Sequence, residues 1–189
     1  VSGTTRLNAN IGTTGNQTYS GAMTVAANAN VAASSNNAVI TLASTLAADV
    51  AASKSLNISA SGLDTKVVLA GVVGAVNLSA LSVTASTINL NATAVTTSGN
   101  QTYAGAVTLG GNTNLTGTNL ITTVGSTIAG AGFSMNITGN DFIGGDISGV
   151  NALTVSGTTA LNANVSTTGS QTYTGAMTLG ANATLLASN

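Results

Sequence analysis

Asp141 and Asp146 are the two acidic residues that lie closest together in this chain of 189 residues. Paired carboxylates carry out general acid–base cleavage of glycosidic bonds, and dense groups of acids bind Ca²⁺ through about six to eight oxygen atoms. This pair stands in the glycine-rich stretch NDFIGGDISG, without a nearby base or an aromatic platform for a sugar. We therefore interpret both residues as exposed turn residues, and we expect no catalytic residue, no metal site and no cofactor.

The remaining charged residues predict no reaction either. Lys54, Asp64 and Lys66 form a small cluster that we interpret as a solvated bulge. The chain contains no His and no Cys, which excludes His-dependent triads, thiol nucleophiles and disulfides. Its three basic residues cannot neutralise a phosphate backbone, so we expect no nucleic-acid partner. No apolar run approaches the length of a membrane-spanning helix, so we also expect no membrane span.

A Q-T-Y motif occurs three times and gives the most distinctive candidate residues, which are Gln17, Tyr19, Gln101, Tyr103, Gln171 and Tyr173. One interpretation is structural: each tyrosine caps a narrow core or covers a coil edge, and the glutamine donates to a turn carbonyl. The other interpretation is functional: the tyrosines line up as an exposed aromatic row that binds glycans.

The motif belongs to a longer internal repeat. Residues 1–34 and 155–188 are identical at 24 of 34 positions, and a third copy occupies residues 85–118. The segments between the copies, residues 55–83 and 134–155, are also related once gaps are allowed. The repeat unit is therefore about 70–84 residues long, and we expect insertions to absorb the difference between its copies.

Short apolar runs with a period of two residues predict many short strands that end in Gly, Asn or Ser. The step along the chain from Ile88–Leu90 to Val107–Leu109 fits one coil of three short strands. We therefore predict an all-β fold, a parallel β-helix or β-solenoid of about nine coils of roughly 20 residues, about 45 Å long. The absence of Pro fits continuous ladders, and the rarity of charge avoids stacking like charges on one another.

Residues 38–54 allow two interpretations. Leu42, Leu46 and Val50 stand at i, i+4 and i+8, which is the spacing of a short helix outside the solenoid. The flanking pattern is that of strands, so strands within the solenoid are the alternative.

The string TTGNQTYSGAMTV and its copies TSGNQTYAGAVTL and TTGSQTYTGAMTL resemble the repeat regions of filamentous-haemagglutinin-like large exoproteins. The resemblance covers nearly the whole chain. It implies a right-handed parallel β-helix in a secreted adhesin, located outside the cell or on the bacterial cell surface. The chain has no Arg-Gly-Asp or other recognisable receptor motif.

These observations together predict a single continuous solenoid over residues 1–189, belonging to a longer chain. Its expected function is that of a non-catalytic structural shaft of an extracellular bacterial fibre or adhesin. The alternative is a solenoid face that binds carbohydrate or a cell surface. The expected partners are neighbouring solenoid segments or copies stacked end to end, and surface glycans or host and neighbour cells under the alternative.

Overall fold

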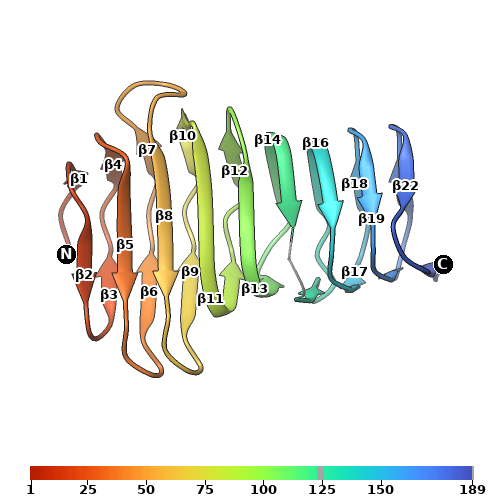
Figure 1. Cartoon of the computed structure of the whole chain (residues 1–189), viewed down its shortest axis with the longest axis horizontal. Coiled ribbons are helices and arrows are strands. Elements are labelled where there is room, and N and C mark those ends of the chain that lie inside the picture. Colours follow the sequence, from red (N-terminus) through yellow and green to blue (C-terminus); the bar gives the residue numbers. More distant parts are fainter. Residues whose placement is uncertain (123–125, 189) are drawn as a thin grey trace.

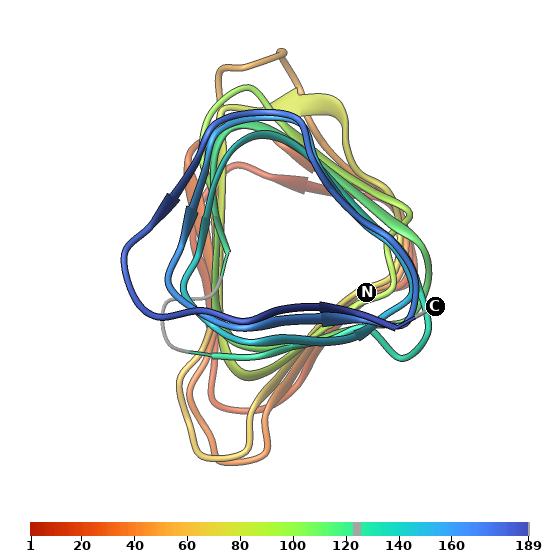
Figure 2. The ribbon, with the colours of Figure 1, turned by 90° about the vertical axis from the view of Figure 1, so that its right-hand side faces the viewer.

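The fold is a three-sided β-solenoid, seen along its axis in Figure 2. The computed structural model describes residues 1–122 and 126–188, and within those residues every regular element is a β-strand. All the strand pairs are parallel, and the described strands form about nine coils, so the predicted fold class and coil number are confirmed. The right-handed sense of the coil stays a prediction from the resemblance. No helix of the described residues is long and apolar enough to cross a membrane.

Each coil contributes one strand segment to each of three faces, which we name after their first strands (Figure 1). The β1 face contains β1 (Thr5–Leu7), β4 (Met23–Val25), β7 (Leu46–Ala48), β10 (Val73–Leu78), β12 (Ala94–Thr97), the first parts of β14 (Thr113–Thr122) and β16 (Met135–Ile143), β18 (Leu153–Val155) and β21 (Gln171–Tyr173). The β2 face contains β2 (Ile11–Thr13), β5 (Ala29–Ala33), β8 (Ser55–Ala60), the first parts of β11 (Ala80–Leu90) and β13 (Gln101–Leu109), the second parts of β14 and β16, β19 (Thr159–Leu161) and β22 (Met177–Leu179). The β3 face contains β3 (Gln17–Tyr19), β6 (Val39–Leu42), β9 (Lys66–Leu69), the second parts of β11 and β13, β15 (Ile128–Ala129), β17 (Ile147–Val150), β20 (Val165–Thr167) and β23 (Leu185–Ala187).

The core consists of columns of side chains that run along the solenoid axis. Because residues alternate between the two sides of a strand, each short strand sends one or two side chains inward, where they stack on their partners in the next coil. The column on the β3 face shows the principle and contains Gln17, Ile40, Val67, Ile88, Val107, Ile128, Ile147, Val165 and Leu185. A chain with few large residues therefore still builds a continuous apolar interior.

Residues 38–54 form strands of the solenoid. They contain β6 on the β3 face and β7 on the β1 face, so the helical alternative for this segment is wrong. The stacking of Leu42 on Tyr19 and of Leu46 on Met23 outweighs the helical spacing, because each residue gains an in-register partner in the coil before it.

The coils differ in length because their corners differ. Thr5 pairs with Met23 on the next coil, whereas Leu46 pairs with the more distant Val73. The additional residues form loops that project from the rod after β7, after β5 and after β8 (Figures 1 and 2). The strands next to these loops still pair without a register shift, as in β5 with β8 and β6 with β9, whereas β10 with β12 and β17 with β20 contain irregularities.

Other corners have no loop, and the strand itself bends around the edge of the solenoid. In β13 the bend lies at Gly105, which has a φ of 154°. A Cβ atom at this position would collide with the carbonyl oxygen of Ala85 in the preceding coil. The glycine that follows Q-T-Y by two positions is therefore required by the close approach of two backbones.

Candidate functional site

The Gln and Tyr side chains of each Q-T-Y motif form a hydrogen-bonded unit at a corner of the solenoid, which we call the Gln–Tyr bracket. The copy at Gln101 and Tyr103 shows its contacts most completely. Gln101 is fully buried, and its Nε2 donates to the carbonyl oxygen of Thr116 at 2.7 Å and to that of Val95 at 3.1 Å. Nε2 also lies 3.2 Å from Thr97 Oγ1, and Gln101 Oε1 accepts a hydrogen bond from the hydroxyl of Tyr103 at 2.9 Å. The amide thus links the tyrosine ring to the next coil of the backbone.

The same hydrogen bonds recur in the other two copies. Tyr19 donates to Gln17 Oε1 at 2.6 Å, and Gln17 Nε2 donates to the carbonyl oxygen of Ala32 at 2.5 Å. Tyr173 donates to Gln171 Oε1 at 3.3 Å, and Gln171 Nε2 donates to the carbonyl oxygen of Leu186 at 2.7 Å. In all three copies the acceptor on the next coil stands at the same sequence distance after the glutamine. These contacts are those of a structural role. The acceptor carbonyls belong to the strands β14, β5 and β23, however, and not to turns as predicted.

The three copies of the motif lie on three different faces. If each face of each coil counts as one strand segment, the copies at Gln17, Gln101 and Gln171 occupy the third, fourteenth and twenty-fifth segments of the described chain. Successive copies are therefore eleven segments apart in both intervals, although the first interval contains more residues than the second. Because eleven is not a multiple of three, each copy moves round the solenoid by one face.

This rotation rules out the functional interpretation of the motif, in which the tyrosines form an exposed aromatic row. Tyr19 belongs to the β3 face, Tyr103 to the β2 face and Tyr173 to the β1 face, so the three rings cannot line up along one surface. Tyr19 and Tyr103 are also buried, and Tyr173 in the final coil is half-buried. Burial raises the pKa of the Tyr19 and Tyr103 hydroxyls, and burial together with the negative charge of Asp141 raises the pKa of Tyr173 to about 12.

The two candidate carboxylates have different surroundings. Asp141 is buried, since it occupies the inward-facing position of β16 that pairs with Thr159 on the next coil. Its interpretation as an exposed turn residue is therefore wrong, because strand pairing fixes its side on the sheet. Asp146 is exposed at a corner, where its Oδ1 accepts a hydrogen bond from the backbone N–H of Asn164 at 2.9 Å. The pair does not present two carboxylates to a common surface.

Asp146 shares its role with a set of asparagines that sequence reasoning missed. At several corners an Asn side-chain oxygen accepts a hydrogen bond from a backbone N–H of the next coil, as in Asn10 to Asn30, Asn28 to Ser55, Asn112 to Ser134 and Asn164 to Thr184, all at 2.9 Å. The only sequence signal is the frequency of Asn next to the apolar runs. These bonds satisfy corner backbone groups that the ladders leave unpaired.

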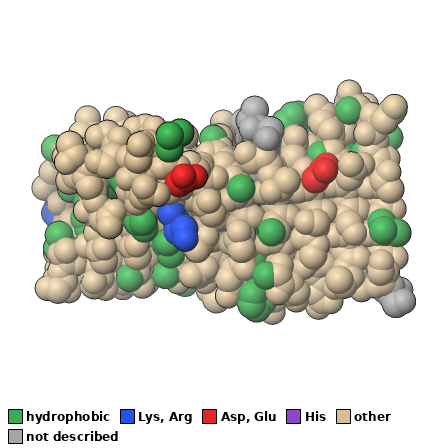
Figure 3. All heavy atoms as spheres, turned by 90° about the horizontal axis from the view of Figure 1, so that it is seen from below, with side chains coloured by type: hydrophobic (Ala, Val, Ile, Leu, Met, Phe, Trp, Pro, Cys, Tyr) green, Lys and Arg blue, Asp and Glu red, His purple; other side chains and the backbone are tan. Residues whose placement is uncertain are grey.

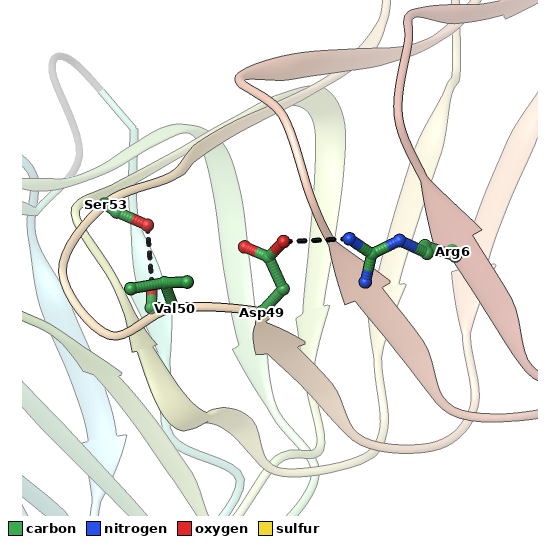
Figure 4. Close-up of polar contacts among 4 residues, drawn as sticks. All are labelled: Arg6, Asp49, Val50 and Ser53. Atoms are coloured by element: carbon green, nitrogen blue, oxygen red, sulfur yellow. Dashed lines mark hydrogen bonds and ion pairs between the residues drawn. The ribbon is translucent and has the colours of Figure 1, made fainter.

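The remaining charged residues are dispersed. Lys54 lies at the corner before β8, whereas Asp64 and Lys66 lie after it. The six residues of β8 separate the two corners by about 20 Å, so the predicted single cluster is wrong. In the described part of the chain the ion pair is Arg6 with Asp49, 3.0 Å apart and bridging coils one and three (Figure 4).

The surface between these charges is neutral. Figure 3 shows one side of the rod, on which charged side chains are sparse among uncharged polar and backbone atoms. Among the described residues, no three His, Cys, Asp or Glu side chains are grouped as metal ligands would be.

A groove lies on the β2 face of the described residues. Its volume is about 420 Å³, and its lining includes Asn28, Asn30, Asn57, Ser82 and Thr102. No charged side chain contributes to the lining. The groove offers amide and hydroxyl groups, which can donate and accept hydrogen bonds but provide neither a strong acid nor a strong base.

The chain matches no model of a known protein family, no curated protein and no solved structure at a significant level.

Proposed function

We propose that this chain is a non-catalytic structural shaft of an extracellular bacterial fibre or adhesin. The observation that carries the proposal is the unbroken parallel pairing of all three faces from the first described coil to the last. Figure 1 shows the result, a rod with its two termini at opposite ends. An element of this shape separates whatever is attached to its two ends.

The internal contacts suit a mechanical role. At each coil boundary three strand pairs act together, and their hydrogen bonds run parallel to the rod axis. The stability of such a solenoid is roughly a sum over neighbouring coils, so length is gained without a larger core. Polar side chains that could serve in catalysis instead hold neighbouring coils together. Asp146 accepts the backbone N–H of Asn164 at a corner, and Gln101 donates to the carbonyl oxygen of Thr116 on the next coil.

The location and the partners rest on the resemblance to large exoproteins. We propose that the shaft stands on the bacterial cell surface, with neighbouring solenoid segments or copies stacked end to end as its axial partners.

Electron microscopy and fibre diffraction of the native material test the shaft. We expect thin unbranched fibres, with a meridional reflection at about 4.8 Å from the stacked coils. Protease treatment of intact cells should release the chain if it is displayed on the surface. Compact particles without an axial reflection would contradict the proposed shaft, and protection of the chain in intact cells would contradict the proposed location.

A further inference from the structure

An uncharged polar ladder runs along the outside of the β2 face. Asn30, Asn57, Ser82 and Thr102 are paired in register on four consecutive coils, and we call them the β2-face ladder. All four side chains point away from the core and are exposed or half-buried. They lie in the lining of the groove, at an axial spacing of about 4.8 Å.

The repeat copies this ladder onto a second face. Eleven strand segments further on, Asn114, Asn136, Thr154 and Thr172 are paired in the same way on the β1 face, and we call them the β1-face ladder. The order is Asn-Asn-Ser-Thr in the first ladder and Asn-Asn-Thr-Thr in the second. The two ladders are therefore displaced by one face and by about 18 Å along the axis.

The corner hydrogen bond next to each ladder is also repeated. Asn28 Oδ1 accepts the backbone N–H of Ser55, and Asn112 Oδ1 accepts that of Ser134, both at 2.9 Å. Each bond fixes the start of the strand that carries the second ladder asparagine. The corner bonds belong to the internal cohesion of the solenoid, whereas the side chains of the ladders face outward. Within the described residues, the structure gives the side chains of Asn57 and Asn136 no hydrogen bond to the protein.

From this duplication we infer that the two ladders are equivalent binding surfaces for a linear, uncharged glycan that lies along the solenoid axis. An amide or hydroxyl on each coil can donate to and accept from sugar hydroxyls, and the regular axial spacing suits a polymer of repeated units. An anionic polymer gains nothing here, because no Lys or Arg contributes to either ladder. The inference goes beyond the shaft role and does not depend on it.

Titration of the 189-residue chain with three neutral probes, cellohexaose, maltohexaose and chitohexaose, tests this inference. The chain is labelled with ¹⁵N at asparagine, so that each side-chain amide gives its own NMR signals, and calorimetry gives the stoichiometry. The test variants are Asn57→Ala, Asn136→Ala and their combination. Asn89→Ala is the matched control, because Asn89 is a half-buried, outward-facing asparagine of β11 on the β3 face.

We expect at least one probe to shift the amide signals of Asn57 and Asn136 and to bind at two sites per chain. Each single variant should abolish one site or weaken it about tenfold, the loss expected for one or two hydrogen bonds. Asn89→Ala should leave binding unchanged. A hexamer of galacturonic acid, as the anionic probe, should bind more weakly than the neutral probe.

Three results would overturn the inference. The first is that none of the neutral probes shifts the ladder amides. The second is that Asn89→Ala weakens binding as much as Asn57→Ala does. The third is concentration-dependent sedimentation of the unmodified chain that the double variant abolishes, without glycan binding, which would assign the ladders to lateral contacts between copies. None of these results bears on the shaft itself, which fibre diffraction tests separately.

Discussion

Replacing Gln101 with leucine removes the side chain that links a buried tyrosine to the backbone of the next coil. The hydroxyl of Tyr103, which is only 1% exposed, loses its acceptor, and the carbonyl oxygen of Thr116 loses a donor at 2.7 Å. A buried polar group without a partner costs about 1–3 kcal/mol. With the hydroxyl and the carbonyl both affected, we expect Gln101→Leu to lower the free energy of unfolding by about 3 kcal/mol.

A double-mutant cycle separates the bond from the loss of either side chain. Tyr103→Phe alone leaves the amide oxygen of Gln101 unpaired, and we expect a loss of about 1–2 kcal/mol. Combined with Gln101→Leu, the phenylalanine removes the hydroxyl that the leucine leaves unpaired. The double variant should therefore be more stable than the sum of the two losses predicts, by about 1–2 kcal/mol.

Urea denaturation followed by far-ultraviolet circular dichroism measures these free energies, and native-state amide exchange shows whether the loss is confined to the neighbouring coils. Gln171→Leu is the matched control, because Gln171 makes the same hydrogen bonds in a half-buried setting where water replaces the lost partner. We expect it to cost less than about 1 kcal/mol. Equal losses of stability at Gln101 and Gln171, or strictly additive losses in the cycle, would refute the stabilising role of the Gln–Tyr bracket.

Three further predictions concern single positions. Gly105→Ala should destabilise the chain by at least about 2 kcal/mol in urea denaturation, because its Cβ meets the carbonyl oxygen of Ala85, and full stability would contradict the close approach. Burial raises the Tyr103 pKa above its ordinary value of 10.0, so the folded chain keeps a proton that the unfolded chain releases. The hydroxyl's contribution is complete below about pH 10 and falls by about 1.4 kcal/mol per pH unit above it. Tyr103→Phe should make the alkaline loss of stability shallower in melting curves without abolishing it, because the pKa values of Tyr19 and Tyr173 are raised as well. Asp146→Asn should melt at the temperature of the unmodified chain, because the amide keeps an oxygen that accepts the N–H of Asn164. Asp146→Ala loses this acceptor and should lower the free energy of unfolding by about 1 kcal/mol. Equal melting of both variants would show that the hydrogen bond is dispensable.

The sequence predicted the fold class closely because the relevant signals are local. Period-two runs such as Val107–Leu109 identify strands, and their separation from Ile88–Leu90 sets the length of a coil. The structure pairs these same residues on adjacent coils of the β3 face. The prediction for Asp141 is wrong because its glycine-rich context indicates a turn, whereas the chain there continues as β16 and turns the carboxylate inward.

What the sequence determined by itself is that coils stack in parallel, since Thr, Val, Gly and Asn in short alternating runs allow few other folds. What only the tertiary structure decided is which face each residue occupies. Each coil has three strand segments, so the face on which a residue lies depends on how many segments precede it. Because the loops between segments differ in length, this number does not follow from counting residues. The longer first repeat and the shorter second repeat both span eleven segments, so Tyr19 and Tyr103 share a motif but not a surface. Because the repeat spans eleven segments, the β2-face ladder at Asn57 recurs as the β1-face ladder at Asn136.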